Sequence, residues 1–490
     1  MPVDHAGVHA RLQPDRLAVH ELASDRRWTY AAFDHAIGAC AQTLVDRGCE
    51  PGDRVAALAR NRVELLLLHL ACARIGAIYV PLNWRLSAPE LRALIDDCEP
   101  RLLVGDEELA RAGRDGLRIE TLAENIAAAQ PRATTPIDRD RPSLILYTSG
   151  TTGRPKGVLL SERNIDQTAI NFGRLARVTH DSVFLNDSPM FHVVGLVTSV
   201  RAPLMHGGAL LVSDGFEAGR TLARMADPAL AVTHYFAVPQ MAAMLRDHPS
   251  YDPEKLRRLT GIFSGGAPHA AAAIRRWTDD GIPLVDGFGM SEGGTISCMA
   301  VDCALIDARA GSAGVAMPGV VLRVVDGAGE DCPPGTPGEL LLKGDNMFRE
   351  YWRRPDETAA AFTTDGWFRT GDIAILDGDG FLALVDRKKD MYISGGENVY
   401  PAEIEALLAG HPGIVECAVV GVPDDRWGEV GHLAIVALGE PPEAAAIRAL
   451  FEPAVARFKH PHHISFIDAL PRNGAGKVLK RDLRDLLIRG

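Results

Sequence analysis

The chain has few of the features that mark secreted, membrane-spanning or nucleic-acid-binding proteins. Its eight cysteines form no Cys-x-x-Cys pair and no regular framework, so we expect reduced, structural thiols in a cytoplasmic protein. The N-terminus lacks an apolar signal core, and the longest apolar stretch, residues 65–78, is interrupted by His69 and Arg74 and is too short to span a bilayer. The sequence therefore predicts neither secretion nor integral membrane association.

Excess positive charge is also missing. The chain has 52 Lys and Arg residues against 64 Asp and Glu residues, which gives a net charge of −12 and argues against a nucleic-acid partner. The chain is long and rich in apolar residues. It has 490 residues, of which 47% are hydrophobic, and is too long to fold around a single hydrophobic core of ordinary size. We therefore expect a globular enzyme with a large domain and a smaller one.

Strand and helix patterns alternate along most of the chain. A helical pattern from Thr29 and another at 62–75 flank expected strands at 53–58 and 77–81. The alternation returns with a helix opening near Ser161 and with strands expected at 182–185, 209–212, 232–238, 261–263 and 283–285. This βαβ alternation predicts an α/β fold with parallel sheets covered by helices.

The pattern changes after Pro318. Alternating stretches at 320–325 and 339–343 predict a small β-subdomain, and the charged run 386–390 reads as a linker. The region beyond the linker predicts a small α+β domain. Its expected elements are strands at 414–422 and 464–467, a helix at 444–458 and a last helix with Leu479, Leu483 and Leu486 on one side.

The segment 147–158, YTSGTTGRPKGV, follows an apolar run that is typical of a buried strand. Its glycines let backbone N–H groups approach an anion, its hydroxyl side chains add donors, and Lys156 adds a positive charge. The Walker spacing is absent. The segment predicts a polyphosphate-binding loop, and the alternative is a flexible surface loop.

The same twelve-residue string resembles the phosphate-loop signature of the adenylate-forming family, which includes acyl-CoA synthetases, peptide-synthetase adenylation domains and firefly luciferase. The resemblance implies that the loop holds the β- and γ-phosphates of ATP while the carboxylate of an acid attacks the α-phosphorus. The implied contacts are Thr148, Ser149, Gly150, Thr151, Thr152, Gly153 and Lys156.

The stretch 286–292, DGFGMSE, resembles the family motif whose glutamate binds the magnesium on ATP. Glu292, with Thr148, is therefore the implied Mg²⁺ ligand, because a cation must neutralise a triphosphate before a carboxylate can attack it. The alternative for Glu292 is a solvated turn carboxylate. Phe288 and Ser291 stand where the family usually has Tyr and Thr. Further implied nucleotide contacts are Asp286 to the adenine amino group, Phe288 to the adenine ring, Gly287, Gly289 and Ser291, and Gly266, Ala267 and Pro268 in another candidate pocket segment.

Downstream positions complete the resemblance. Asp372, in Arg-Thr-Gly-Asp, is implied to accept hydrogen bonds from both ribose hydroxyls. Arg387 is implied to contact the nucleotide and Lys389 to be the pivot of a hinge, although such charge runs are commonly just solvated. The implied domains are 1–386 for ATP and acid binding, 387–390 as the hinge and 391–490 as a mobile lid.

The lid carries two implied functional segments. Gly395 and Gly396 are implied to swing in and line the tunnel for the pantetheine arm of CoA. Lys477, in a glycine-containing loop, is implied to bring its ammonium group to the reacting carboxylate and α-phosphate. The alternative for Lys477 is an exposed lysine that precedes a helix.

His192, beside Phe191, resembles the residue that borders the acid pocket, and the alternative is a core histidine. Peptide-synthetase adenylation domains have an Asp just after this aromatic residue to hold an α-amino group, whereas this chain has His192, Val193 and Val194, so the resemblance disfavours an amino-acid substrate. The pocket segments 235–240 and 264–268 contain no Arg or Lys to pair a second carboxylate. We therefore expect an apolar monocarboxylic acid, whether fatty, cyclic or aromatic. The cluster of His460, His462 and His463 lacks acidic or thiol partners at metal spacing and receives no role.

The predicted activity is that of an AMP-forming acyl-CoA synthetase, in which ATP activates the acid as acyl-AMP with release of pyrophosphate and CoA then accepts the acyl group. One alternative is a ligase that loads the phosphopantetheine arm of an acyl carrier protein. The other, of a different class, is a nucleotide-binding homologue without catalysis.

Overall fold

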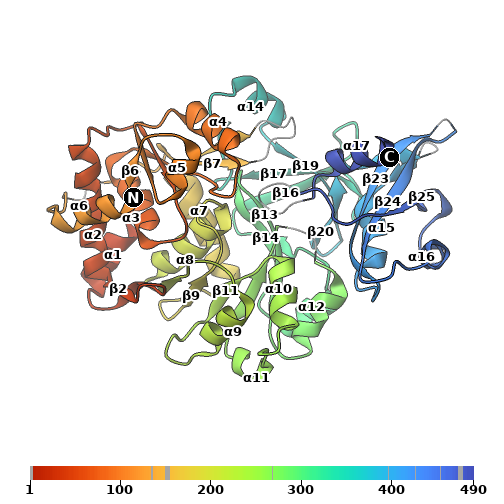
Figure 1. Ribbon diagram of the computed structural model, residues 1–490, viewed down its shortest axis with the longest axis horizontal. Coiled ribbons are helices and arrows are strands. Elements are labelled where there is room, and N and C mark those ends of the chain that lie inside the picture. The colour runs from red at the N-terminus through yellow and green to blue at the C-terminus, as the bar shows by residue number, and fades with distance from the viewer. Residues whose placement is uncertain are drawn as a thin grey trace. The chain divides into compact units, whose positions relative to one another are not determined.

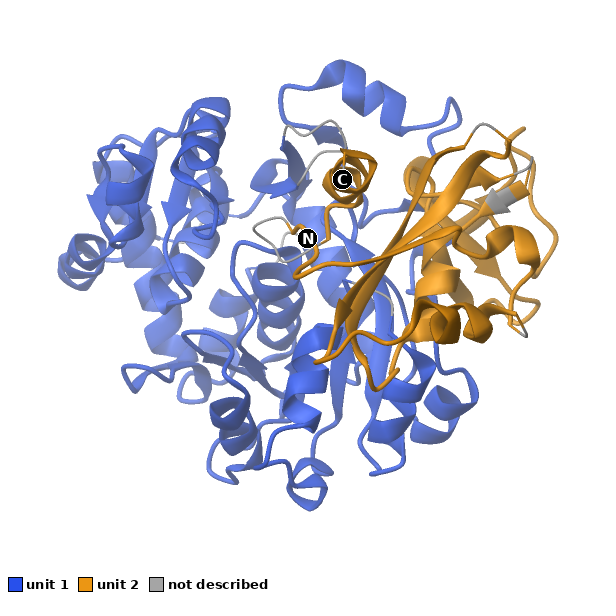
Figure 2. Cartoon of the chain, turned by 45° about the vertical axis from the view of Figure 1, so that its right-hand side comes forward, with its two compact units in different colours: residues 1–321, 342–367 blue, residues 322–341, 368–490 orange. Residues whose placement is uncertain are grey.

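The computed structural model describes residues 4–133, 136–148, 155–266, 269–394, 397–424, 426–452, 454–472 and 478–489 (Figure 1). The chain divides into two compact units (Figure 2). Unit 1 comprises residues 1–321 and 342–367, and unit 2 comprises residues 322–341 and 368–490. The hinge expected at 387–390 lies inside unit 2, and the proposed rotation about it stays a prediction.

Unit 1 contains a seven-stranded sheet in the order β18-β8-β7-β4-β3-β5-β6. Its interior is parallel, whereas β8 and β18 add antiparallel strands at one edge. The strands are β3 (Arg54–Leu58), β4 (Ile78–Pro81), β5 (Leu102–Gly105), β6 (Leu117–Arg118), β7 (Pro142–Thr148), β8 (Lys156–Ser161) and β18 (Glu350–Tyr351).

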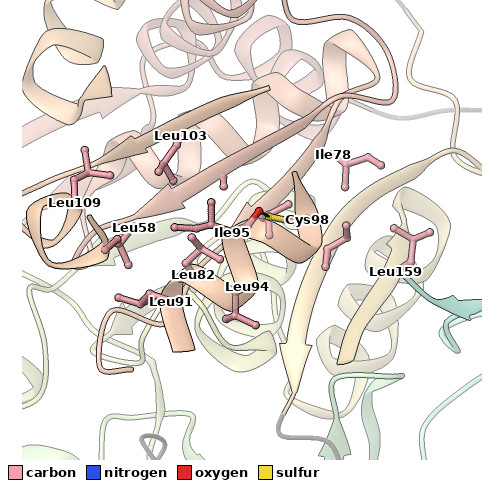
Figure 3. Close-up of a cluster of buried hydrophobic side chains, with 14 residues drawn as sticks. Leu58, Ile78, Leu82, Leu91, Leu94, Ile95, Cys98, Leu103, Leu109 and Leu159 are labelled. Atoms are coloured by element: carbon pink, nitrogen blue, oxygen red, sulfur yellow. Dashed lines mark hydrogen bonds between the residues drawn. The ribbon is translucent and has the colours of Figure 1, made fainter. Parts of the chain in front are cut away.

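Helix α4 (Ala88–Cys98) packs its apolar face against this sheet (Figure 3). Leu91, Leu94 and Ile95 of the helix lie in one buried cluster with residues such as Leu58 and Leu103 of the strands. Each fully buried leucine stabilises the fold by roughly 1.5–3 kcal/mol. The cluster thereby holds in place the strands whose carboxyl ends precede the candidate site.

A nine-stranded sheet follows in the order β15-β14-β13-β12-β11-β9-β10-β1-β2. Strands β1, β10, β9, β11, β12 and β13 are parallel, and β2, β14 and β15 are antiparallel. The bounds are β1 (Leu17–Glu21), β2 (Arg26–Thr29), β9 (Val183–Asn186), β10 (Ala209–Val212), β11 (His234–Phe236), β12 (Gly261–Ser264), β13 (Leu284–Met290), β14 (Gly294–Cys298) and β15 (Val315–Ala316).

Helices connect the parallel strands of both sheets, as the alternation predicted. Ser161 accepts a hydrogen bond from the Asn164 N–H and so begins α7 where the sequence placed a helix start. The remaining helices of unit 1 are α1 (His5–Leu12), α2 (Tyr30–Asp46), α3 (Val63–Ile75), α5 (Glu108–Ala112), α6 (Ile119–Ala128), α7 (Glu162–Leu175), α8 (Ser199–His206), α9 (Ala218–Ala226), α10 (Pro239–Arg246), α11 (Pro253–Leu256), α12 (Ala271–Thr278), α13 (Cys303–Ala308) and α14 (Pro355–Ala361), with a π-helical turn at Val194–Thr198.

Unit 2 contains a five-stranded sheet in which β22, β21, β24 and β23 follow one another and β25 pairs with β24. A four-stranded sheet, β16-β17-β19-β20, also lies mostly in this unit. The bounds are β16 (Val320–Val325), β17 (Gly338–Gly344), β19 (Phe368–Leu376), β20 (Leu382–Arg387), β21 (Tyr392–Ser394), β22 (Glu397–Val399), β23 (Ile414–Asp424), β24 (Gly428–Ala437) and β25 (His463–Phe466), with helices α15 (Pro401–Leu408), α16 (Ala444–Phe451) and α17 (Lys480–Arg489).

Four expected elements need correction. The strand expected at 232–238 spans only His234–Phe236. The strand expected at 283–285 continues to Met290, because residues 287–290 pair with β14. The helix expected at 444–458 ends at Phe451, since Pro453 in the sequence cannot continue a helix. The last helix begins at Lys480 and packs through Leu483 and Leu487, whereas Leu486 is 53% exposed.

The state of the cysteines and the character of the helices can be compared with the expectations from the sequence. All eight cysteines are free thiols, and five of them are buried. In the part of the chain that the structure describes, no helix combines the length and the apolar character that crossing a membrane requires.

Candidate active site

The two strands that flank the phosphate loop are neighbours. Thr148 ends β7 and Lys156 begins β8, and the two residues are directly paired across these antiparallel strands. The Thr148 hydroxyl donates to the Lys156 carbonyl at 3.5 Å. The loop residues Ser149, Gly150, Thr151, Thr152 and Gly153 lie outside the described residues.

Lys156 and Glu292 both contact one tyrosine. The Lys156 ammonium nitrogen lies 5.1 Å from the ring centroid of Tyr351, and the Tyr351 hydroxyl donates to Glu292 Oε1 at 2.9 Å. Lys156 Nζ also lies 2.6 Å from Glu357 Oε2. The structure therefore gathers the expected phosphate-binding lysine and the expected metal-binding carboxylate in unit 1, together with a segment that the sequence did not single out.

Oxygen atoms of Glu292 and Thr148 are the hard donors that Mg²⁺ prefers, and this metal commonly uses one or two protein ligands with substrate phosphates and water. The Tyr351 hydroxyl donates to only one of the two oxygens of Glu292, Oε1, and so orients the carboxylate. The residues present therefore fit magnesium.

Close backbone packing fixes the motif around Glu292. A Cβ atom at Gly287 would lie 2.7 Å from the carbonyl oxygen of Ser297, so only glycine fits there. One at Gly265 would lie 3.0 Å from the Gly287 carbonyl oxygen. The carboxyl ends of β12 and β13 thus approach one another, at the edge where open α/β sheets commonly place ligands.

Asp286 is the buried carboxyl of this edge. Burial raises the pKa of Asp286 to about 7, and the N–H of Gly287 donates to its Oδ1 at 3.0 Å. Ser264 is its register partner on β12, and the Ser264 hydroxyl is buried without a hydrogen-bond partner among the described residues. The ring of Phe288 is only 8% exposed, so stacking of this ring on adenine stays a prediction.

Of the other pocket residues on this edge, Gly266 has a left-handed backbone with φ of 88°, and Gly289 and Ser291 are partly exposed. A Cβ atom at Gly266 would lie 3.9 Å from Val238, which brings two expected pocket segments together. Ala267 and Pro268 lie outside the described residues.

His192 lies in an aromatic cluster. Its ring centroid is 4.5 Å from that of Phe191, and Trp84 meets Phe191 edge-on at 6.3 Å. The Arg85 guanidinium lies 5.0 Å from the Trp84 ring and 5.9 Å from the Phe191 ring. Burial, and then the positive charge of Arg85, lower the pKa of His192 to about 4, so the imidazole is neutral at pH 7.

Sequence reasoning did not find Trp84 and Arg85. They follow β4, a strand of the parallel part of the sheet, and residues just beyond the carboxyl ends of such strands are frequent ligand contacts. Asn61, just after the neighbouring strand β3, accepts from the Met190 N–H at 2.9 Å and so holds the chain that leads to His192.

In unit 2, Asp372 and Arg387 form an ion pair. Arg387 Nε lies 2.6 Å from Asp372 Oδ1, and Gly371 adopts a left-handed φ of 70° immediately before Asp372. Lys389 is exposed in the turn after β20. Gly395, Gly396 and Lys477 lie outside the described residues.

The comparisons with known proteins assign the family. Residues 8–352 match the profile of the AMP-binding enzyme, and residues 403–477 match that of the AMP-binding enzyme C-terminal domain. The chain belongs to the AMP-binding enzyme family. The order of the two matches agrees with a large domain that is followed by a smaller one.

Relatives cover nearly the whole chain. It is 38% identical over 482 residues to a feruloyl-CoA synthase of Amycolatopsis sp, covering 97% of this chain and 96% of the relative. It is also 38% identical over 500 residues to an indoleacetate–CoA ligase of Aromatoleum aromaticum, with 98% and 97% covered. A solved O-succinylbenzoate coenzyme A synthetase from Bacillus subtilis, in complex with ATP and magnesium ion, superposes with a TM-score of 0.89 at 29% identity and covers 98% of this chain and 99% of that one.

These findings confirm the predicted family, the α/β fold class and an AMP-forming acyl-CoA synthetase. The acid that this protein activates and the roles of individual residues stay predictions.

Proposed function

We propose that this protein is an ATP-dependent ligase that activates an apolar monocarboxylic acid as acyl-AMP and then transfers the acyl group to the thiol of CoA. The observation that carries the proposal is the convergence of Lys156 and Glu292 on Tyr351, because a phosphate-binding cation and a metal-binding carboxylate are the two groups that a triphosphate requires.

In the first half-reaction, an oxygen of the acid's carboxylate forms a bond to the α-phosphorus of ATP as pyrophosphate leaves. Lys156 and the loop before it bind the outer phosphates, and Asp372 accepts from the ribose. Magnesium, when bound at Glu292 and Thr148, supplies positive charge that offsets the charge of the triphosphate. Lys477 brings a cation to the reacting carboxylate, where negative charge develops.

Activation is required because a thiolate cannot displace hydroxide from a carboxylate, whereas AMP is a good leaving group. In the second half-reaction, the CoA thiolate forms the thioester bond to the acyl carbon and AMP departs. We infer that residues 391–490 rotate about Lys389 between the two steps, which replaces Lys477 by Gly395 and Gly396 beside the acyl group.

The surroundings of His192 support an acid with an apolar body. Phe191 and Trp84 offer ring surface beside a neutral imidazole, and Val238 lies beside Gly266 in the other pocket segment. The relatives that act on ferulate and indoleacetate, by their names, are ligases of acids with an aromatic body. We therefore place aromatic acids first among the fatty, cyclic and aromatic candidates.

Arg85 favours a second candidate substrate, a dicarboxylic acid. Arg85 is exposed, and its guanidinium has no carboxylate partner within ion-pair distance among the described residues, although it lies beside the aromatic cluster. A cation at this position suits either the single carboxylate as it enters or a second anionic group on the acid.

A panel of acids with ATP, magnesium and CoA, read by AMP release, tests the proposal. The panel should pair each aromatic, cyclic and fatty monocarboxylic acid with the dicarboxylic acid of the same skeleton. We expect AMP release with monocarboxylic acids, and preference for the dicarboxylic partners would establish the second candidate. Replacing CoA by a phosphopantetheinylated carrier protein tests the carrier alternative. Acid-dependent exchange of labelled pyrophosphate into ATP would exclude a non-catalytic homologue.

A further inference from the structure

The segment from Tyr351 to Glu357 contacts both charged groups of the triphosphate site. Tyr351 donates a hydrogen bond to Glu292 Oε1 at 2.9 Å, and Glu357 Oε2 lies 2.6 Å from Lys156 Nζ. The Lys156 ammonium also lies 5.1 Å from the Tyr351 ring, a distance at which a cation is attracted to an aromatic face.

Backbone pairing fixes this segment beside Lys156. Tyr351 pairs with Val158 on β8, and the Trp352 N–H donates to the Gly157 carbonyl at 2.7 Å. The side chain of Arg354 donates to Asp97 at 2.6 Å, and the same carboxylate accepts from the Tyr147 hydroxyl at 2.6 Å. The segment is therefore attached to both strands that flank the phosphate loop, β7 and β8.

The Tyr351–Glu292 hydrogen bond and the Lys156–Glu357 ion pair have different consequences for a bound triphosphate. A tyrosine hydroxyl that donates to one oxygen of Glu292 fixes the orientation of the carboxylate. The carboxylate of Glu357 balances the positive charge of Lys156, but the two side chains are partly exposed, Lys156 at 18% and Glu357 at 38%. Such exposed pairs are weak, so a triphosphate with several negative charges can displace Glu357.

We propose that Tyr351 is a positioning residue for the metal-binding carboxylate Glu292, and that Glu357 is an internal counter-ion which ATP displaces from Lys156. This inference rests on the proposed function, because it assumes that Lys156 and Glu292 serve a magnesium-bound triphosphate. It adds two residues to the site, both outside the motifs that the sequence singled out.

Calorimetric titration of ATP, with magnesium or with excess EDTA, tests the role of Tyr351. We expect Tyr351→Phe to weaken binding of magnesium-bound ATP by roughly tenfold, because one hydrogen bond to a charged group is lost. Binding of metal-free ATP should stay unchanged. Tyr251→Phe is the matched control, since the Tyr251 hydroxyl also donates to a carboxylate, Asp280, at 2.8 Å. Equal losses with and without magnesium, or no loss at all, would overturn this role.

The proposed role of Glu357 predicts that its replacement strengthens ATP binding. Glu357→Gln should bind ATP about two- to fivefold more tightly, with or without magnesium, because the competing ion pair is gone. The difference should shrink at high salt. Asp356→Asn removes the same charge from the neighbouring exposed residue and serves as the control. Affinity that falls, or that merely matches the Asp356→Asn variant, would overturn the counter-ion role.

Pyrophosphate exchange distinguishes a failure of these two residue roles from a failure of the proposed ligase function. If the unmodified protein exchanges pyrophosphate in the presence of an acid while the Tyr351 and Glu357 variants behave like their controls, only this inference fails. If the variants change ATP binding as described but no acid supports exchange, the proposed ligase function fails instead.

Discussion

Arg387 Nε lies 2.6 Å from Asp372 Oδ1, and the two residues are directly opposite each other on β19 and β20. Two residues that the family resemblance links to the nucleotide are therefore held together by the pairing of one hairpin. The side chain of Asp372 is only 7% exposed, so this pair is less screened by water than a surface ion pair.

Asp372→Asn should raise the KM for ATP by about 10- to 100-fold, because the amide replaces one acceptor oxygen by a donor and removes the charge. The KM for the acid should stay within about twofold of the original, since the expected contact is to the ribose. Pyrophosphate exchange at varied ATP and then at varied acid measures both. Asp379→Asn, in the exposed turn of the same hairpin, is the control, and equal increases in both constants would contradict a ribose contact.

Asp286 predicts a pH dependence of stability. Burial raises the pKa of Asp286 from its ordinary value of 3.8 to about 7, so the folded protein retains a proton that the unfolded chain releases in this window. The contribution of this group to the free energy of unfolding therefore falls as the pH rises from about 4 to about 7, by at most about 4 kcal/mol. Asp286→Asn should remove this slope and be the more stable protein at pH 8.

Denaturant unfolding at several pH values between 4 and 8 measures this difference. Asp279→Asn, at an exposed position after α12, should leave the slope in place. Parallel stability curves for the Asp286→Asn variant and the original protein would show that Asp286 does not retain its proton in the folded state.

Arg85→Gln should raise the pKa of His192 from about 4, because one of the two causes of the low value is removed. Burial, the larger cause, remains, so the pKa should stay below its usual 6.5. The KM for the acid should rise several-fold with the loss of the cation. NMR titration of the imidazole and initial rates at varied acid measure these effects. Arg60→Gln is the comparison, because Arg60 lies 4.7 Å from the same Trp84 ring but is not a cause of the His192 shift.

The two half-reactions should separate in lid and hinge variants. We expect Lys477→Ala to lose acyl-AMP formation by on the order of a hundredfold or more, while it still converts supplied acyl-AMP to the thioester. Lys389→Pro should keep adenylation and lose thioester formation, because proline fixes φ at the expected pivot. Single-turnover assays of each step would show this, and equal loss of both steps in either variant would contradict the division of labour.

The candidate site residues that the sequence supplied lie in contiguous motifs, and their roles stay predictions. YTSGTTGRPKGV and DGFGMSE each combine a strand end with the turn after it, and the structure brings Lys156 and Glu292 onto Tyr351. Tyr351 and Glu357 could not be found in this way, because they reach the phosphate loop through the pairing of β18 with β8, which are distant in sequence. Arg85 was missed because no local pattern shows that the turn after β4 lies beside Phe191.

The errors in the predicted strands and helices have similar causes. Strand β13 extends to Met290 because β14 pairs with it, and the glycines at 287 and 289, a residue type depleted in strands, argue locally against a strand. The exposed Leu486 shows that a leucine spacing of seven residues does not by itself decide which face of a short helix is buried.

The two-residue strand β18 has a consequence for synthesis of the chain. Glu292 has its orienting hydrogen bond only when Tyr351 lies beside it, and both residues are made long after the phosphate loop has left the ribosome. Magnesium-bound ATP therefore cannot be fully bound while the first sheet folds during translation, and the early strands depend on buried contacts such as those of α4 and α5. Tight binding of magnesium-bound ATP should thus report that the growing chain has passed Tyr351 and that β18 has paired with β8.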